Sequence, residues 1–164
     1  SRFGETFVIP EAVTPAAGAR VMDLQAPASK MSKSADSDAG CVFLLDDPRA
    51  IEKKFKRAVT DSESEVRYSV AEKPGVSNLL DILAAAGGGT PAQLAEKYNQ
   101  YGPLKADAAS AVIAMLEPIQ HRYRELMNDP GELQRLLNIG ANRAQEQAAT
   151  TLSRAYEAIG LLPR

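Results

Sequence analysis

The sequence predicts a mostly α fold: a helical bundle over residues 46–164 that follows a short β-containing region over residues 1–45. Pairs in which a capping side chain precedes proline, a common helix start, occur at Asp47-Pro48, Thr90-Pro91 and Asp129-Pro130. In the second half of the chain, apolar residues recur every three or four positions, the spacing of one helix face. Proline and glycine instead interrupt the β-containing region, which is typical of short strands and turns.

The β-containing region holds two short segments of strand-forming residues, Thr6–Ile9 and Arg20–Leu24. Neither is long enough to make a stable sheet alone, because an isolated pair of strands is marginal in water. A third candidate strand lies further along at Val66–Val70, before the turn at Pro74-Gly75. The expected β component is therefore minor.

Helices account for most of the chain after residue 46. Capping residues, prolines and glycines predict them at Pro48–Val59, Val76–Ala86, Ala92–Asn99, Leu104–Asn128 and from Pro130 to a stop at Gly160. The last two helices carry continuous apolar stripes. The first stripe comprises Leu104, Ala108, Val112, Met115, Ile119, Tyr123 and Leu126, and the second comprises Leu133, Leu137, Gly140, Ala144, Ala148, Leu152, Ala155 and Ile159. We interpret both stripes as faces buried in the core.

Composition limits the classes of protein that the chain can belong to. Its 164 residues, 45% apolar and 24% charged, are normal for one folded domain and exclude wholesale disorder. A net charge of −2 excludes a strongly basic protein, so any nucleic-acid binding must come from a local patch. No apolar run approaches the roughly 18 residues of a membrane span, and no signal peptide is visible. The single cysteine fits a reducing compartment, so we expect a cytoplasmic protein with no membrane partner.

The segment Ser29–Gly40 is the most informative part of the chain. Its two lysines, Lys30 and Lys33, lie three residues apart among serines and other small residues, so their ammonium groups can move onto a polyphosphate. The plain alternative is a solvated serine- and lysine-rich loop. Residues 30–34 spell KMSKS, however, and a chance match in a chain of this composition is on the order of 1 in 20,000. That probability argues against the alternative.

KMSKS is the second signature of the class I aminoacyl-tRNA synthetases, and the rest of the chain resembles the bacterial tryptophanyl-tRNA synthetases. The similar stretches are Phe7–Glu11, Gly18–Met22, Leu44–Pro48, Ile51–Ser62, Lys73–Leu80 and Pro118–Tyr123. They cover essentially the whole chain and follow the order of the C-terminal half of the family. The resemblance implies the activation of tryptophan by ATP to tryptophanyl-adenylate, followed by transfer to tRNA(Trp).

The resemblance also assigns the parts of the chain. Residues 1–45 would be a remnant of a Rossmann-type nucleotide-binding domain with the KMSKS loop, and residues 46–164 a helical region that binds tRNA and its anticodon. The family's nucleotide-binding strands, tryptophan pocket and most of its homodimer interface lie upstream, so we expect this chain to be inactive alone. Two alternatives remain: a noncatalytic helical RNA-binding or adaptor module, and a synthetase for another amino acid such as tyrosine.

By resemblance, Lys30 and Lys33 are the catalytic residues, which contact the β- and γ-phosphates of ATP, with Lys33 favoured for the transition state. Ser32 and Ser34 would bond phosphate or hold the shape of the loop. Removing one such preorganised donor raises a reaction barrier by roughly 3 to 4 kcal/mol.

Two further residues are expected at the nucleotide. Met31 would place its backbone against the adenine, and Val21 would supply an apolar wall beside it, although a plain core valine explains Val21 equally well. Mg²⁺ is expected with the phosphates of ATP, but no Asp or Glu of the chain has the pattern of a dedicated metal ligand.

A basic segment follows the loop. Arg49, Lys53, Lys54, Lys56 and Arg57 accompany a single acidic residue, Glu52. A solvated helix face explains this pattern, and contact with the phosphates of tRNA is the alternative. For the anticodon end of tRNA, the sequence offers several arginines without choosing between them: Arg122, Arg124, Arg135 and Arg143.

Overall fold

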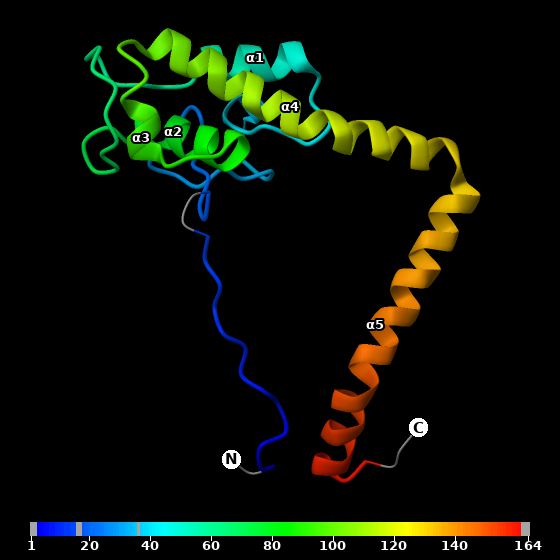
Figure 1. Cartoon of the computed structure of the whole chain (residues 1–164). Coiled ribbons are helices and arrows are strands. Elements are labelled where there is room, and N and C mark those ends of the chain that lie inside the picture. The colour runs from blue at the N-terminus through cyan, green and yellow to red at the C-terminus, as the bar shows by residue number, and fades with distance from the viewer. Residues whose placement is uncertain (1–2, 16–17, 36, 162–164) are drawn as a thin grey trace. The chain divides into compact units, whose positions relative to one another are not determined.

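The computed structural model describes residues 3–15, 18–35 and 37–161 (Figure 1). Its elements are a short 3₁₀ helix η1 (Asp38–Gly40) and the helices α1 (Pro48–Lys56), α2 (Pro74–Gly87), α3 (Pro91–Ala95), α4 (Tyr101–Asn128) and α5 (Pro130–Ile159). The prediction of a mostly helical protein is confirmed. In the part of the chain that the structure describes, no helix has the length and apolar character needed to cross a membrane.

Each expected helix is present, and its capping chemistry is as predicted. Asp47, Thr90 and Asp129 each accept a hydrogen bond from a backbone N–H in the first turn of α1, α3 and α5. Gly160 ends α5 in the left-handed conformation, with φ of 76°. Helix α3 is shorter than expected because the turn after it tightens, with the N–H groups of Lys97 and Tyr98 each bonded three residues back.

The prediction of strands is wrong for the described residues. Thr6–Ile9 has a bend at Phe7 and Val66–Val70 ends in a turn, and neither segment pairs with a neighbour to form the ladder of hydrogen bonds that a strand requires. Arg20–Leu24 forms a single antiparallel bridge, between Met22 and Lys30. On the other edge of this segment, the side chain of Asn78 bonds the backbone N–H and C=O of Met22, where a third strand would otherwise pair.

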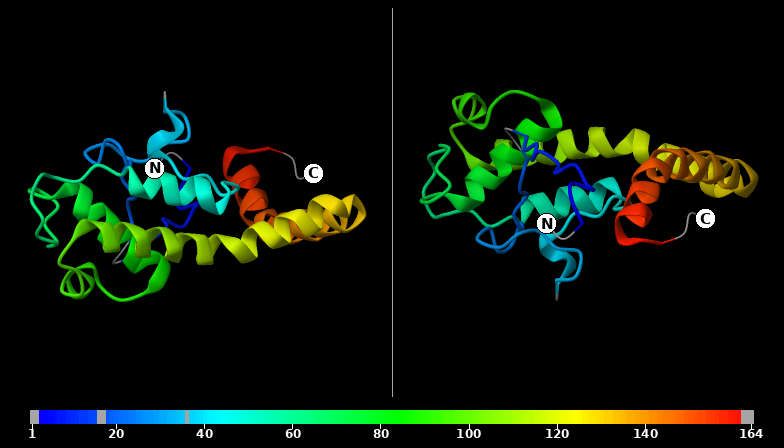
Figure 2. Two further views of the ribbon diagram at one scale, coloured as in Figure 1. Left: turned by 90° about the horizontal axis from the view of Figure 1, so that it is seen from above. Right: turned by 90° about the horizontal axis from the view of Figure 1, so that it is seen from below.

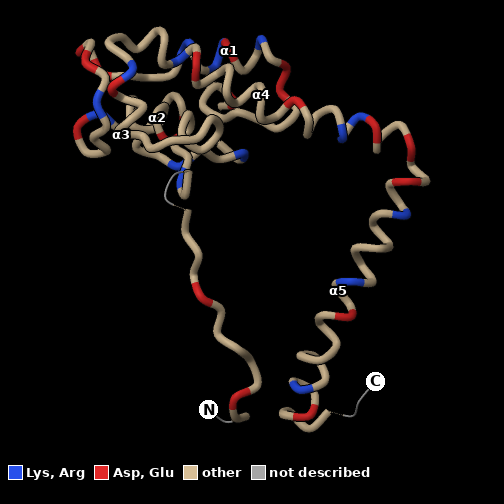
Figure 3. Tube along the Cα trace, viewed as in Figure 1, with Lys and Arg blue, Asp and Glu red and all other residues tan. Residues whose placement is uncertain are grey.

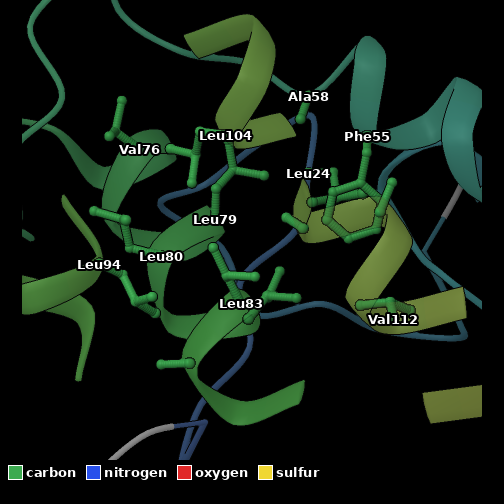
Figure 4. Packing of buried hydrophobic residues seen from close by; sticks show 14 of the residues in the cluster. Leu24, Phe55, Ala58, Val76, Leu79, Leu80, Leu83, Leu94, Leu104 and Val112 are labelled. Atoms are coloured by element: carbon green, nitrogen blue, oxygen red, sulfur yellow. The ribbon is translucent and has the colours of Figure 1, made fainter. Parts of the chain in front are cut away.

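The chain divides into two compact units, and the core lies in the unit that spans residues 14–122. There the first part of α4 runs alongside α1 in both views of Figure 2. Figure 4 shows the core that these helices share with α2: Phe55, Leu79 and Leu104 come from three different helices, and Leu24 joins them from the segment before the KMSKS loop. Each of these four side chains is at most 1% exposed. The KMSKS loop therefore starts from a residue fixed in the core.

A buried lysine ties the connection between α1 and α2 to the start of α4. Lys73 Nζ lies 3.0 Å from Asp61 Oδ1, 2.6 Å from Glu63 Oε2 and 3.0 Å from the Tyr101 hydroxyl. Burial alone would lower the pKa of Lys73, but the hydrogen bonds to Glu63, Tyr101 and Asp61 outweigh it and raise that pKa. The cation is therefore structural. Gly75, next on α2, is required for packing, because a Cβ there would lie 2.1 Å from the Val59 carbonyl oxygen.

Helix α5 departs from the sequence prediction. The second unit comprises residues 1–13 and 123–164, and no residue of α5 is buried. Leu137 is 59% exposed and Leu152 is 50% exposed, although both lie on the expected core stripe. The interpretation of that stripe as core is therefore wrong for the described chain. The stripe of α4 is buried only in its first part, at Leu104, Ala108 and Val112. Periodicity identifies an apolar face but not what covers it.

Two leucines on the long helices provide a matched test of this difference in burial. Leu104→Ala should lower the free energy of unfolding by about 2–5 kcal/mol, because it opens a cavity in a fully buried site. Leu137→Ala should change it by less than about 0.5 kcal/mol. Urea denaturation followed by tyrosine fluorescence measures both values, since the chain has no tryptophan. Equal losses at the two positions would show that the α5 face is buried in solution.

Candidate nucleotide-binding loop

The base of the KMSKS loop is held by a short antiparallel pairing. Asp23 N–H donates to the Ser29 carbonyl at 2.9 Å, and Met31 N–H donates to the Val21 carbonyl at 3.0 Å. These two bonds flank Met22 and Lys30, which form a bridge without bonding each other directly. The pairing closes the turn over residues 24–28 and holds the segment that enters the KMSKS motif.

Asn78, a buried residue of α2, completes this base. Its Oδ1 accepts from Met22 N–H at 2.9 Å, and its Nδ2 donates to the Met22 carbonyl at 2.8 Å. One side chain amide thus satisfies both backbone groups of Met22 in the way that a neighbouring strand would. The sequence does not predict this role, because an asparagine inside a helix gives no local signal of a partner 56 residues away.

Asp23 and Gly40 close the loop at its two ends. Asp23 Oδ1 accepts from the N–H groups of Gln25 and Ala26 at 2.7 and 2.9 Å, which forms the first turn. The Gly40 carbonyl accepts from Leu24 N–H at 2.9 Å. A Cβ at Gly40 would lie 1.9 Å from Asp23 Oδ1, so only glycine permits this approach. The ends of the loop are therefore held together by groups close to the core.

The outer part of the loop is exposed and has only local hydrogen bonds. Ser34 N–H donates to Ser32 Oγ at 3.3 Å, and the two serine hydroxyls lie 3.4 Å apart. Lys30 and Lys33 are exposed, and neither forms an ion pair with any carboxylate in residues 3–15, 18–35 or 37–161. Both ammonium groups are thus accessible to an anion from solution, on a loop whose base is anchored.

Val21 and Met31 lie together on the inner side of the loop. Both are half-buried against the core, and both line an apolar cavity of about 180 Å³ whose other walls include Val42, Phe55 and Leu116. The Met31 N–H is bonded to the Val21 carbonyl. An incoming base that meets Met31 would therefore find its N–H already used.

The basic segment is not uniform. Lys54 donates to Asp46 Oδ2 at 2.6 Å and to the Cys41 carbonyl at 2.7 Å, and its Nζ lies 4.9 Å from the centroid of the Phe43 ring. This lysine fastens α1 to the segment that leaves the loop, so it does not belong to a free basic face. The remaining cations of α1 and its C-cap, visible as blue segments in Figure 3, are exposed: Arg49, Lys53, Lys56 and Arg57.

Two polar side chains of the long helices, Gln120 and the candidate Arg135, have partners within the protein. Gln120 Nε2 donates to the carbonyls of Leu44 and Asp46, both at 2.9 Å, which joins α4 to the start of α1. Arg135 bonds Glu132 through two guanidinium nitrogens at 2.7 and 2.9 Å.

In the described residues, no group of three or more His, Cys, Asp or Glu side chains could hold a metal ion.

The comparison with protein families agrees with this loop and helical fold. A family model described as tRNA synthetases class I (W and Y) matches residues 1–117. The chain therefore belongs to the class I tRNA synthetases of the tryptophan and tyrosine type.

Individual relatives point to the tryptophan branch of that family. The chain is 52% identical over 162 residues to tryptophan–tRNA ligase 1 of Streptomyces coelicolor and 49% identical over 166 residues to tryptophan–tRNA ligase of Mycobacterium leprae. These alignments cover 99% and 100% of this chain but 48% of each relative. The resemblance to tryptophanyl-tRNA synthetases is confirmed, and the chain spans about half the length of these relatives.

Solved structures give the same result for the fold. The tryptophanyl-tRNA synthetase of Mycoplasma pneumoniae superposes with a TM-score of 0.83 at 30% identity, over 94% of this chain and 47% of that one. The enzyme of Campylobacter jejuni, in a complex with ADP and tryptophan, superposes with a TM-score of 0.60 at 26% identity, over 97% of this chain and 49% of that one.

Asn78→Ala should loosen the base of the loop, because it leaves the backbone N–H and C=O of Met22 without partners. Each unsatisfied group costs about 1–3 kcal/mol, so exchange of the Asp23 and Met31 amide protons should accelerate by about tenfold or more. Hydrogen exchange read by NMR measures this. Asn99→Ala, at an exposed position, is the matched control and should leave both amides unchanged. Unchanged exchange in the Asn78 variant would contradict the assigned role.

Proposed function

We propose that this chain supplies the phosphate-binding loop and the helical tRNA-binding region of a tryptophan–tRNA ligase. Such an enzyme activates tryptophan with ATP to tryptophanyl-adenylate and transfers the tryptophanyl group to tRNA(Trp). The observation that carries the proposal is the exposed pair Lys30 and Lys33 on a loop anchored only at its base. The names of the relatives support tryptophan as the amino acid.

In the activation step, a carboxylate oxygen of tryptophan attacks the α-phosphorus of ATP. The bond from that phosphorus to the bridging oxygen breaks, and pyrophosphate leaves with the electron pair. No covalent intermediate on the protein is needed, so catalysis depends on position and on neutralising the charge that moves onto pyrophosphate. Lys30 and Lys33 perform this neutralisation at the β- and γ-phosphates, and both are catalytic residues in this proposal.

The short side chains between the lysines have a supporting role. Ser32 and Ser34 bond phosphate oxygens or hold the turn, and their hydroxyls already lie close enough to shape it. Because the loop has only local hydrogen bonds, it can close over the leaving group without breaking core contacts. Two ammonium groups that approach as charge develops stabilise the transition state more than the ground state.

The adenine of ATP lies against Val21 and Met31 in this proposal. Both side chains already line an apolar wall, which suits the face of a purine. The Met31 N–H is bonded to the Val21 carbonyl, so the Met31 carbonyl is the group left to accept a hydrogen bond from the adenine amino group.

Mg²⁺ would arrive with the phosphates of ATP and would neutralise part of their charge. The residues around the loop fit a metal held mainly by the nucleotide. Asp23, the buried acidic residue at the base, already accepts two backbone hydrogen bonds through Oδ1. We assign no residue of this chain as a metal ligand.

The domain organisation follows from the same proposal. Residues 1–45 are a remnant of a Rossmann-type nucleotide-binding domain that ends in the KMSKS loop. Residues 46–164 form the helical region that contacts tRNA and its anticodon, with the exposed cations of α1 as candidate contacts to phosphates. The complete enzyme is a homodimer whose tryptophan pocket lies outside this chain.

Two other functions predict different results. A noncatalytic RNA-binding adaptor would carry the same loop and bind tRNA, but would support no ATP chemistry in any context. A tyrosine enzyme belongs to the same family and would activate tyrosine instead. The amino acid that a complete enzyme activates distinguishes a tyrosine enzyme from the proposed tryptophan enzyme.

A chimera tests the proposed chemistry. Residues 1–164 replace the matching 162 residues of the Streptomyces coelicolor relative, and tryptophan-dependent exchange of pyrophosphate into ATP is measured. Lys33→Ala in this chimera should slow exchange by about 10²–10³-fold, with a much smaller effect on ATP binding. Lys97→Ala, an exposed lysine outside the loop, is the control and should exchange normally.

Other results of the same assay would argue against the proposal. A chimera that folds, judged by its melting curve, but exchanges nothing would favour the adaptor. Equal losses of exchange and ATP binding in Lys33→Ala would make Lys33 a ground-state anchor. Robust exchange by residues 1–164 alone would contradict the assignment of the tryptophan pocket to another part of the enzyme.

A further inference from the structure

A groove of about 500 Å³ lies between α1 and the first part of α4, away from the residues assigned to the KMSKS loop. From α1 it is lined by Glu52 and Lys56, and from α4 by Gly102, Lys105, Ala106, Ala109 and Ser110. All seven residues belong to the unit of residues 14–122. Neither the apolar stripe of α4 nor the catalytic proposal accounts for this groove.

The groove has one cation from each helix. Lys56 and Lys105 form no ion pair with a carboxylate in the described ranges 3–15, 18–35 and 37–161. Burial lowers the pKa of Lys105, which means that its charge is partly desolvated and gains from a nearby anion. Glu52 opposes an anion, but it is the one acidic residue of the lining against the two lysines. Asp107, the acidic neighbour of Lys105 on α4, is held by the Tyr98 hydroxyl at 2.8 Å.

The floor of the groove suits the backbone of a polymer. Gly102, Ala106 and Ala109 have no long side chains, and nothing lies within 4 Å of where a Cβ at Gly102 would be. Ser110 is exposed, and its hydroxyl donates to the Ala106 carbonyl at 2.9 Å. Because its proton is used within the helix, Ser110 Oγ can act toward a ligand as an acceptor. The ligand should therefore combine an anion with a nearby hydroxyl donor.

We propose that the groove between α1 and α4 binds the sugar–phosphate backbone of RNA. Lys56 and Lys105 contact phosphate oxygens from opposite walls, and Ser110 accepts a hydrogen bond from a ribose 2′-hydroxyl. RNA has both groups within one repeating unit, whereas DNA lacks the hydroxyl donor. This inference rests on the proposed function as a tRNA ligase, and it adds α4 to the surface that contacts tRNA.

The salt dependence of binding tests the phosphate contacts. Fluorescence anisotropy with the 164-residue chain and a labelled tRNA(Trp) transcript gives the slope of log affinity against log salt. Lys56→Ala and Lys105→Ala should each reduce that slope by about one unit, because each removes one phosphate contact. Lys105→Arg should preserve it. Lys97→Ala, which removes the same charge outside the groove, should leave the slope unchanged.

The serine contact is tested by comparing RNA with DNA of the same sequence. Ser110→Ala should reduce the preference for RNA about fivefold, the loss expected for one hydrogen bond. An unchanged preference would overturn the role of Ser110. Equal slopes for Lys105→Ala and Lys97→Ala, in variants with unchanged melting curves, would overturn the proposal that the groove binds RNA. So would competition by poly-glutamate as strong as that by RNA, since the groove would then bind acidic peptides.

The outcome is separable from that of the proposed function. Lys33→Ala should slow exchange in the chimera by about 10²–10³-fold but leave the contribution of Lys105 to the salt slope intact. Lys105→Ala should leave tryptophan-dependent exchange in the chimera unchanged, because the groove lies apart from the loop. Loss of exchange in that variant would contradict a role confined to RNA.

Discussion

The two hydrogen bonds between Asn78 and Met22 are the constraint on which the candidate site depends. They attach the segment before the KMSKS loop to α2, and α2 belongs to the core. Within the described residues the segments around the loop share a single bridge, and so short a pairing is marginal without further support. The helical unit therefore does this work through a side chain, and the loop can move while its two ends stay fixed.

The lysines of the chain fall into two physical classes. Lys54 and Lys73 are shielded from solvent and bonded to carboxylates, so they hold segments together. Lys30 and Lys33 are exposed and have no acidic partner in the described residues, so their charge is available to a ligand. A mobile phosphate-binding loop needs the second class at its outer part and the first class in its support. In this chain Lys54 holds the segment that leaves the loop, and the exposed Lys30 and Lys33 belong to the loop itself.

The helices could be predicted from the sequence because local chemistry determines them. Caps such as Asp47 and Asp129, and the stop at Gly160, act within one helical turn. The KMSKS motif could also be identified directly from the sequence. Thr6–Ile9 was predicted to be β-prone but forms no strand, because strand formation depends on a partner that the local sequence does not reveal. The predicted burial of the α5 stripe was wrong for a similar reason, since an apolar helix face does not specify which part of the protein packs against it.

Long-range contacts of the site could not be predicted in the same way. Nothing near Asn78 indicates that its amide bonds Met22, and nothing near Lys54 separates it from its exposed neighbours Lys53 and Lys56. Both assignments require the three-dimensional path of the chain. Gly40 is a partial exception, since a glycine that closes a loop is a common sign of close packing, here against Asp23.

We propose that the charges of Lys30 and Lys33 have no acidic partner until a polyphosphate binds. Lysine acetylation followed by mass spectrometry tests it most directly on the 164-residue chain, with and without pyrophosphate. Acetylation of the exposed Lys30 and Lys33 should be fast, and acetylation of the shielded Lys54 and Lys73 should be slow. Pyrophosphate should protect the first pair selectively, with exposed Lys97 as the reference. Slow modification of Lys30 and Lys33 without ligand, or equal protection of Lys97, would contradict the account.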